Sequence, residues 1–187
     1  SDVYKRQLQE YAEKCLVAEI TRQKVDLPAV NDRAGLATYF KFHSSDYRWE
    51  HPRYKGVVLH CVDKKTVKQA KKLLKKVPEK EWEEVLRQTF NTSGEEKIKV
   101  EQGIFADGDN KYIDKLVFKK GGFEPVMSYP FTVVAGKKQK GPDDYREVID
   151  QVRKDYRNYL NAYWERELEE SGKVEINQEV LKTVNNN

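Results

Sequence analysis

The spacing of hydrophobic residues predicts helices at both ends of the chain and a mixed, partly strand-like region between them. From Gln7 the apolar residues recur every three or four positions, which is typical of an amphipathic helix (Leu8, Tyr11, Ala12, Cys15, Leu16 and Ile20). We expect this helix to end before VDLPAVND, because Pro28 cannot continue it. A second, short helix is predicted in AGLATYFKFHS, with Asp32 as its N-cap.

The middle of the chain alternates between strand and helix signals. RYKGVVLHCV is a short β-branched run that predicts a buried strand, and Asp63 is placed to cap the helix that follows. A further helix is predicted in EKEWEEVLRQTF, and the period-two alternation of KIKVEQGIF predicts a half-buried strand. We then expect a short helix in KYIDKLVF, an edge extension in FEPV and a closing strand in YPFTVVAGKK.

The last element is a long helix over residues 142–171, with Pro142 and two aspartates at its start and Gly172 as its stop. One stripe of it is apolar and aromatic (Tyr145, Val148, Ile149, Val152, Tyr156, Tyr159, Leu160, Tyr163 and Leu168). Such a stripe favours docking against other helices, and a free peptide-binding face is the alternative. A tail, KVEINQEVLKTV, ends in a predicted last helical turn and a polar NNN. The order of all these elements predicts an α+β fold.

Charge changes this picture little. The chain has 187 residues, with 35 basic and 31 acidic ones and a net charge of +4, which is a smaller basic excess than phosphate-dominated nucleic-acid binding requires. Seven lysines occupy residues 64–76, and the acidic EKEWEE follows as compensation. We favour a solvated helix face for these lysines, with nucleic-acid binding and attraction of acidic protein segments as the alternatives.

Residues with catalytic or metal-binding chemistry are few and scattered. Cys15 and Cys61 lack CxxC spacing, and we expect two free buried thiols, although the sequence does not show whether they pair. His43, His51 and His60 have no metal-ligand spacing and are expected to be structural or exposed. We therefore expect no metal, no cofactor and, since no long apolar run occurs, no membrane span. Composition and spacing alone indicate an α+β domain flanked by helices, without an evident active site.

The order of segments resembles that of parvulin-type (PpiC-type) peptidyl-prolyl isomerases. The resemblance rests on the first strand with its two following helices, on Gly103-Ile104-Phe105, on the helix that ends at Phe118, on Glu124-Pro125-Val126 and on FTVVAGKK. The long last helix and VEINQEVLKTV resemble the end of SurA-like foldases, which carry tandem parvulin domains. The resemblance implies a degenerate parvulin-like domain, a small antiparallel sheet with helices, flanked by N-terminal helices and a long C-terminal helix.

The chain departs from this family at the positions that matter for catalysis. The two family histidines fall at Gly56 and near Phe131, the loop Cys or Asp near Thr92–Ser93, and the groove Met and Phe near Asp109 and Ile113. His60 replaces the first histidine only if the strand slips by four residues, which breaks the match with the next helix. We therefore expect no catalytic residues, and peptide-binding candidates remain (Phe105, Ile113, Met127, Tyr129 and Phe131).

The resemblance implies a periplasmic chaperone that binds unfolded or extended protein segments, outer-membrane proteins among them, through an inactive isomerase-like domain. An active prolyl isomerase is the first alternative and a basic nucleic-acid-binding module the second. We interpret residues 1–7, SDVYKRQ, as a non-native scar from a transposon end. The expected division is a helical segment at 8–50, the parvulin-like domain at 51–138 and the long helix with its tail at 139–187. We expect a signal peptide and any active parvulin domain in a missing N-terminal part of the same chain, which would also be a partner of this fragment.

Overall fold

A computed structural model describes the backbone of residues 1–185 and the side chains of residues 1–170. The chain divides into two compact units, residues 1–47 with 142–187 and residues 48–141. We call the first the helical unit and the second the sheet unit. In the described part of the chain, no helix is both long and apolar enough to cross a bilayer.

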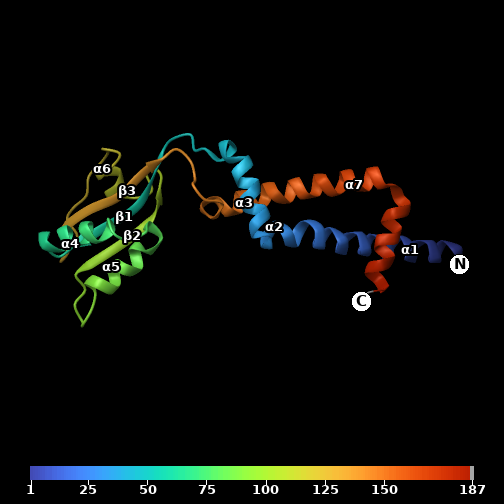
Figure 1. The fold of residues 1–187 in the computed structure, drawn as a ribbon, viewed down its shortest axis with the longest axis horizontal. Helices are drawn as coiled ribbons and strands as arrows, with labels where there is room; N and C mark the ends of the chain where they lie inside the picture. Colours follow the sequence, from blue (N-terminus) through green and yellow to red (C-terminus); the bar gives the residue numbers. More distant parts are fainter. Residues whose placement is uncertain (186–187) are drawn as a thin grey trace. The chain divides into compact units, whose positions relative to one another are not determined.

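The sheet unit is built on an antiparallel sheet of three strands in the order β2-β1-β3 (Figure 1). The strands are β1 (Arg53–Cys61), β2 (Ile98–Phe105) and β3 (Phe131–Gln139). Helices α4 (Lys64–Leu74) and α5 (Trp82–Phe90) cover one face, and α6 (Lys111–Leu116) covers the other. Together with the helical unit described below, this confirms the α+β class expected from the element order.

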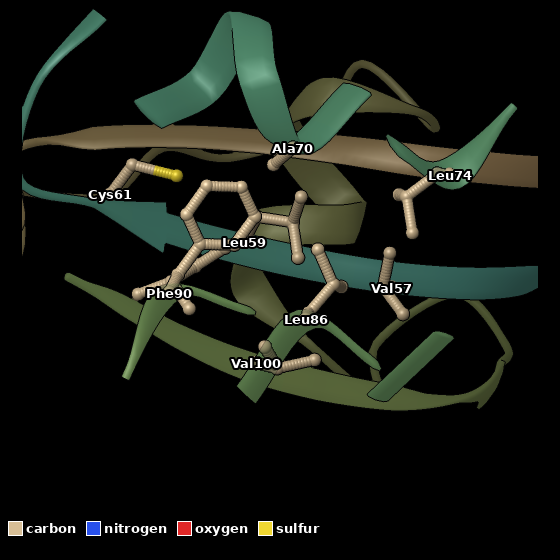
Figure 2. Packing of buried hydrophobic residues seen from close by; sticks show 9 residues of the cluster. Val57, Leu59, Cys61, Ala70, Leu74, Leu86, Phe90 and Val100 are labelled. Atoms are coloured by element: carbon tan, nitrogen blue, oxygen red, sulfur yellow. The ribbon is translucent and has the colours of Figure 1, made fainter. Parts of the chain in front are cut away.

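Successive side chains of each strand point to opposite faces of the sheet, so the two faces carry different residues. Figure 2 shows Val57 and Leu59 of β1 meeting Leu86 and Phe90 of α5 on the face that α4 and α5 cover. Tyr54 and Val58, which alternate with them, pack with Ile113 of α6 on the other face. Burying each aliphatic side chain of this kind contributes about 1.5–3 kcal/mol relative to leaving it exposed. The sheet is therefore held between two hydrophobic layers.

Two helices of the sheet unit begin at side-chain caps. The Thr66 amide donates to Asp63 Oδ1 at 2.7 Å, which confirms the predicted start of α4. At α6 the amides of Tyr112 and Ile113 donate to Asn110 Oδ1 at 3.0 and 3.2 Å, a cap that the sequence analysis did not include. Each cap satisfies amides that have no partner inside the helix.

The predicted edge extension in FEPV is wrong. In this segment, all of which the structure describes, the β-pairing is limited to one isolated bridge between Val126 and Tyr129. Pro125 and Pro130 have no amide hydrogen to give a ladder, and Ser128 turns the chain with a φ of 70°. The segment is therefore a loop, and the closing strand begins only at Phe131.

The helical unit begins with α1 (Asp2–Thr21), a π-helical turn (Arg22–Asp26), α2 (Leu27–Asn31) and α3 (Arg33–Phe42). The α-helix ends at Thr21, before VDLPAVND as predicted, but Pro28 is not what stops it, because the helical backbone continues through the π turn into α2. Pro28 lies in the first turn of α2, and the wider π turn before it has already interrupted the α-helical ladder, so the missing amide costs little. The predicted Asp32 cap of α3 is confirmed by the Gly35 amide, 2.9 Å from Asp32 Oδ1.

A short 3-10 turn (Tyr145–Val148) leads into α7 (Ile149–Asn185), which lies along the N-terminal helices in Figure 1. Most of the predicted stripe packs as a helix-docking face, with Val152 and Tyr156 against Leu36 and Phe40 of α3. Gly172 does not end the helix, so its prediction as a stop is wrong. The side chains of the predicted tail, and the end of NNN, lie outside the described residues.

Three polar pairs join α7 to the N-terminal half of the unit. Tyr47 Oη donates to Asp155 Oδ2 at 2.7 Å, and Tyr156 Oη donates to Asp32 Oδ2 at 2.8 Å. Arg157 Nε donates to Asp26 Oδ1 at 2.9 Å. Asp32 therefore serves both the cap of α3 and the contact with α7, so one carboxylate couples a local helix start to the packing of the long helix.

Candidate functional site

The α6 face of the sheet holds a buried histidine between two polar neighbours. His60 of β1 is 4% exposed, and its strand neighbours are Lys99 of β2 and Thr132 of β3. Its Nε2 lies 3.0 Å from Glu101 Oε2 and its Nδ1 lies 2.8 Å from Thr132 Oγ1. A carboxylate only accepts hydrogen bonds, so Nε2 is the donor toward Glu101, and Nδ1 pairs with the Thr132 hydroxyl group. Both ring nitrogens are then occupied, as expected of a structural histidine.

Aromatic rings extend this site away from the strand. The Tyr112 ring meets the His60 ring edge-on, with centroids 4.5 Å apart, and the Phe123 ring meets Tyr112 in the same way at 4.8 Å. Tyr112 is held there by the Asn110 cap at the start of α6. A cavity of about 430 Å³ opens beside these groups, and its lining includes His60, Glu101, Lys99, Tyr112 and Val126. We call it the His60 cavity.

A row of three glycines crosses the same sheet, and it includes Gly56, where the sequence resemblance would place a histidine. Gly56 of β1 pairs with Gly103 of β2 and with Gly136 of β3. A Cβ atom on Gly56 would lie 2.1 Å from the Ala135 carbonyl oxygen, and one on Gly136 would lie 2.2 Å from the Lys55 carbonyl oxygen. Gly136 also has a φ of 151°, which side chains rarely tolerate. The chain therefore lacks a side chain at position 56 and also lacks the space for one.

The five peptide-binding candidates do not form one surface. Phe105 and Ile113 belong to the hydrophobic layer under α6, where Ile113 is fully buried. Phe131 packs with the layer under α4 and α5, on the opposite face of the sheet. Met127 is 90% exposed in the loop before β3.

Tyr129 lies at the strand edge of that loop. Its Oη donates to the Glu96 carbonyl oxygen at 2.9 Å, and the Lys99 ammonium lies 5.0 Å from its ring centroid. Met127 and Tyr129 therefore lie in one loop. The other three candidates, Phe105, Ile113 and Phe131, belong to the hydrophobic layers on the two faces of the sheet.

The members of the His60 cavity were missed as a group. The alternation of KIKVEQGIF places Lys99 and Glu101 on one face of β2, but only the strand register reveals that this face is shared with His60. Thr132 and Tyr112 come from still more distant segments. Among the described side chains, no cluster of three or more His, Cys, Asp or Glu residues is arranged to hold a metal ion.

The two cysteines lie in different environments and are both free. Cys61 is buried in the layer under α4 and α5, where burial, followed by the charge of Asp63, raises the pKa of its thiol to about 11. Cys15 is exposed, so the expectation of two buried thiols is wrong for this residue. The raised pKa of the Cys61 thiol is the opposite of the depressed pKa of a reactive cysteine.

The exposed apolar side chains lie mainly in the helical unit. Of the large hydrophobic residues recorded as exposed, only Met127 belongs to the sheet unit, and the others belong to the helical unit (Val3, Tyr4, Leu8, Tyr11, Val17, Leu27, Val30, Phe42, Tyr159 and Tyr163). Solitary exposed apolar residues are ordinary on protein surfaces, but a group on neighbouring helices indicates an interaction surface.

Two tyrosines of this group, Tyr159 and Tyr163, lie on α7, and Tyr159 contacts the half-buried Tyr39 of α3. Tyr159 and Tyr163 are one helical turn apart on α7 and are 52% and 50% exposed. The Tyr39 ring of α3 lies 5.8 Å from the Tyr159 ring and stacks on the His43 ring at 4.0 Å. We call Tyr39, Tyr159 and Tyr163 the tyrosine surface. It presents ring faces for apolar contact, while the Tyr163 hydroxyl group is hydrogen-bonded to Glu167.

Comparisons of the chain with family models, with curated proteins and with solved structures found no match to any of them.

Proposed function

We propose that this chain is a non-catalytic, parvulin-like chaperone of the SurA-like class, which holds unfolded or extended protein segments in the periplasm. The clients would include outer-membrane proteins. The observation that carries the proposal is the concentration of exposed apolar residues on the helical unit outside residues 1–7, including Tyr159 and Tyr163 of the tyrosine surface. Holding an unfolded chain requires sequence-tolerant apolar contact, and aromatic rings supply it at low cost in side-chain entropy.

The order of elements in the sheet unit supports the parvulin-like part of the proposal. A first strand is followed by α4 and α5, a second strand, α6 and a last strand, as in the family that the sequence resembles. The last strand lies beside the first, opposite the second. The edge segment around Glu124-Pro125-Val126 departs from a strand, as described above.

The glycine row supports the absence of turnover. A prolyl isomerase lowers a barrier of about 18–20 kcal/mol by stabilising the twisted amide with placed polar groups. At Gly56 the neighbouring backbone leaves no space for a histidine, and Phe131 packs into the core on the other face. Neither position presents a polar group to a bound proline.

A binding titration tests the proposal. A fluorescently labelled, denatured outer-membrane protein kept soluble in mild urea is titrated with the chain, and anisotropy reports binding. Tyr159→Ser/Tyr163→Ser should weaken binding about tenfold, because an aromatic contact pair of this kind contributes on the order of 1 kcal/mol or more. Met127→Ser, which removes the exposed apolar side chain of the sheet unit, should change binding less than about twofold. Equal binding by all three proteins would contradict the proposal.

An active prolyl isomerase is the second candidate, favoured by the position of His60 at a cavity lined by Tyr112. A protease-coupled assay with a proline tetrapeptide separates the two. We expect no acceleration by the wild-type chain at high micromolar concentration. Acceleration that is lost in His60→Gln would support the isomerase instead.

A further inference from the structure

In the part of the chain whose side chains the structure describes, the lysines around α4 form no close ion pair, and only the charge of Asp63 at the start of the helix acts on one of them, Lys65. Seven lysines occupy residues 64–76, and no acidic residue interrupts them. Among the ion pairs of the described side chains, none involves these lysines, and Glu83 of the following acidic segment pairs with Arg87 at 2.6 Å instead. The expected compensation by EKEWEE therefore does not take place through direct contacts, and the positive charge of this face is available to a partner.

A cleft lies beside this charge, formed by α4, α5 and the loop that leads to β2. Its volume is about 680 Å³, within the range of ligand-binding clefts. The apolar part of its lining is the half-buried Leu73 and the buried Phe90. Three lysines give it positive charge, Lys72, Lys76 and Lys97, against a single carboxylate, Glu95, which lies 3.8 Å from Lys97.

The uncharged part of the lining also suits carboxylate ligands. Gln69, Thr89, Thr92 and Ser93 add an amide and three hydroxyl groups, all on exposed residues. These groups donate hydrogen bonds, as the ammonium groups do. The cleft therefore combines one apolar contact area with donors of positive or neutral character.

We propose that this cleft binds an extended acidic segment of a partner protein, with one apolar side chain against the half-buried Leu73 and carboxylates on the surrounding lysines. We call it the lysine cleft. The inference does not rest on the proposed chaperone function, because it uses a different surface in the other unit. For the lysines of residues 64–76 it favours the attraction of acidic protein segments, one of the two alternatives to a solvated helix face.

Two other anionic partners fit this surface less well. Nucleic acid binding without base readout uses exposed aromatic rings for stacking, whereas the aromatic ring of this cleft, Phe90, is 7% exposed. A membrane-surface helix inserts apolar side chains among the lipids, and no large hydrophobic residue of α4 or α5 is among those recorded as exposed. An acidic peptide with one apolar residue can place that residue against the half-buried Leu73 without a rearrangement of the cleft.

The test is an anisotropy titration of the full chain with a short labelled peptide of Asp and Glu that carries one central Leu. Lys72→Gln/Lys76→Gln removes two cleft lysines. Lys65→Gln/Lys68→Gln is the matched control, since it removes the same charge from α4 at positions outside the cleft lining. We expect about tenfold weaker binding for the first variant and less than about twofold for the second. Replacing the central Leu with Ser should weaken binding by about fivefold.

The remaining arms use single-stranded DNA of arbitrary sequence and vesicles with phosphatidylglycerol, and the wild-type chain should bind both more weakly than it binds the peptide. Absence of peptide binding, equal weakening by both double variants, no effect of the Leu replacement, or tighter binding of DNA or vesicles would each overturn the proposal. Thermal melts of both variants establish that they are folded. A normal client titration with a failed peptide titration would reject the lysine cleft alone.

Discussion

Gly56 and Gly136 face each other across β1 and β3 so closely that a Cβ atom on Gly56 would lie 2.8 Å from the Gly136 Cα atom. Position 56, where the resemblance to the parvulin-type family would place a histidine, is part of a close backbone contact. A histidine side chain at position 56 would have to push β3 away.

Substitution of Gly56 should therefore destabilise the sheet unit. We expect Gly56→Ala to lower the free energy of unfolding by more than about 2 kcal/mol, since its Cβ meets backbone atoms that cannot move aside. Urea denaturation followed by circular dichroism measures this. Gly122→Ala is the matched control, because a Cβ at Gly122 meets no atom within 4 Å and its φ is not positive. A Gly56→Ala variant as stable as the control would refute the close contact.

Asp32 should matter more than either of its partners. Asp32→Ala removes the cap of α3 and leaves the Tyr156 hydroxyl without its acceptor, so we expect a loss of about 2–3 kcal/mol. Tyr156→Phe removes only the second interaction and should cost about 1 kcal/mol. Chemical denaturation of the two variants and the wild type would measure both losses of unfolding free energy. Equal losses in the two variants would show that the cap contributes nothing.

Alkaline pH should unfold the helical unit through its buried tyrosines. Burial, followed by the hydrogen bond to Asp32, raises the pKa of Tyr156 to about 12, and burial with the bond to Asp155 raises the pKa of Tyr47 as well. An unfolded tyrosine ionises near about pH 10. The stabilisation is therefore fully present below about pH 10 and is lost as the pH rises through the folded-state values.

The measurement is the urea midpoint between about pH 8 and about pH 11.5. Tyr47→Phe/Tyr156→Phe should start from a lower midpoint and then fall less steeply. Parallel curves for the wild type and the double variant would contradict the role of these two phenols.

The two thiols should differ in reactivity. At about pH 8 the exposed Cys15 should react with Ellman's reagent at once, whereas Cys61 should react only after urea is added, because burial raises its pKa to about 11 and blocks access. Cys15→Ser should abolish the fast phase and Cys61→Ala the urea-dependent one. Rapid reaction of both thiols in the native protein is the contrary result.

Local signals predicted much of this fold. The period-two alternation of β2, the β-branched run of β1 and the caps at Asp32 and Asp63 depend on neighbouring residues, and all are present in the structure. The errors occur where a local rule has an exception that sequence does not reveal. Pro28 is accommodated after a π turn, and Gly172 lies inside α7.

The candidate sites depended on information that the sequence does not contain. The contacts of His60 with Glu101 and Thr132 can be predicted only when the register of all three strands is known. The placement of Phe131 opposite Phe105 follows from which face each strand position takes. The absence of space at Gly56 needs the separation of two backbones, which no spacing of residue types encodes.

We propose that the helical unit, through its exposed aromatic residues, holds unfolded clients without catalysis. The most direct measurement is light scattering after a denatured outer-membrane protein is diluted into buffer with the wild-type chain, with Tyr159→Ser/Tyr163→Ser or with Met127→Ser. We predict strong suppression of scattering by the wild type and by Met127→Ser, and weaker suppression by the tyrosine variant. Equal aggregation with and without the wild-type chain would contradict the account.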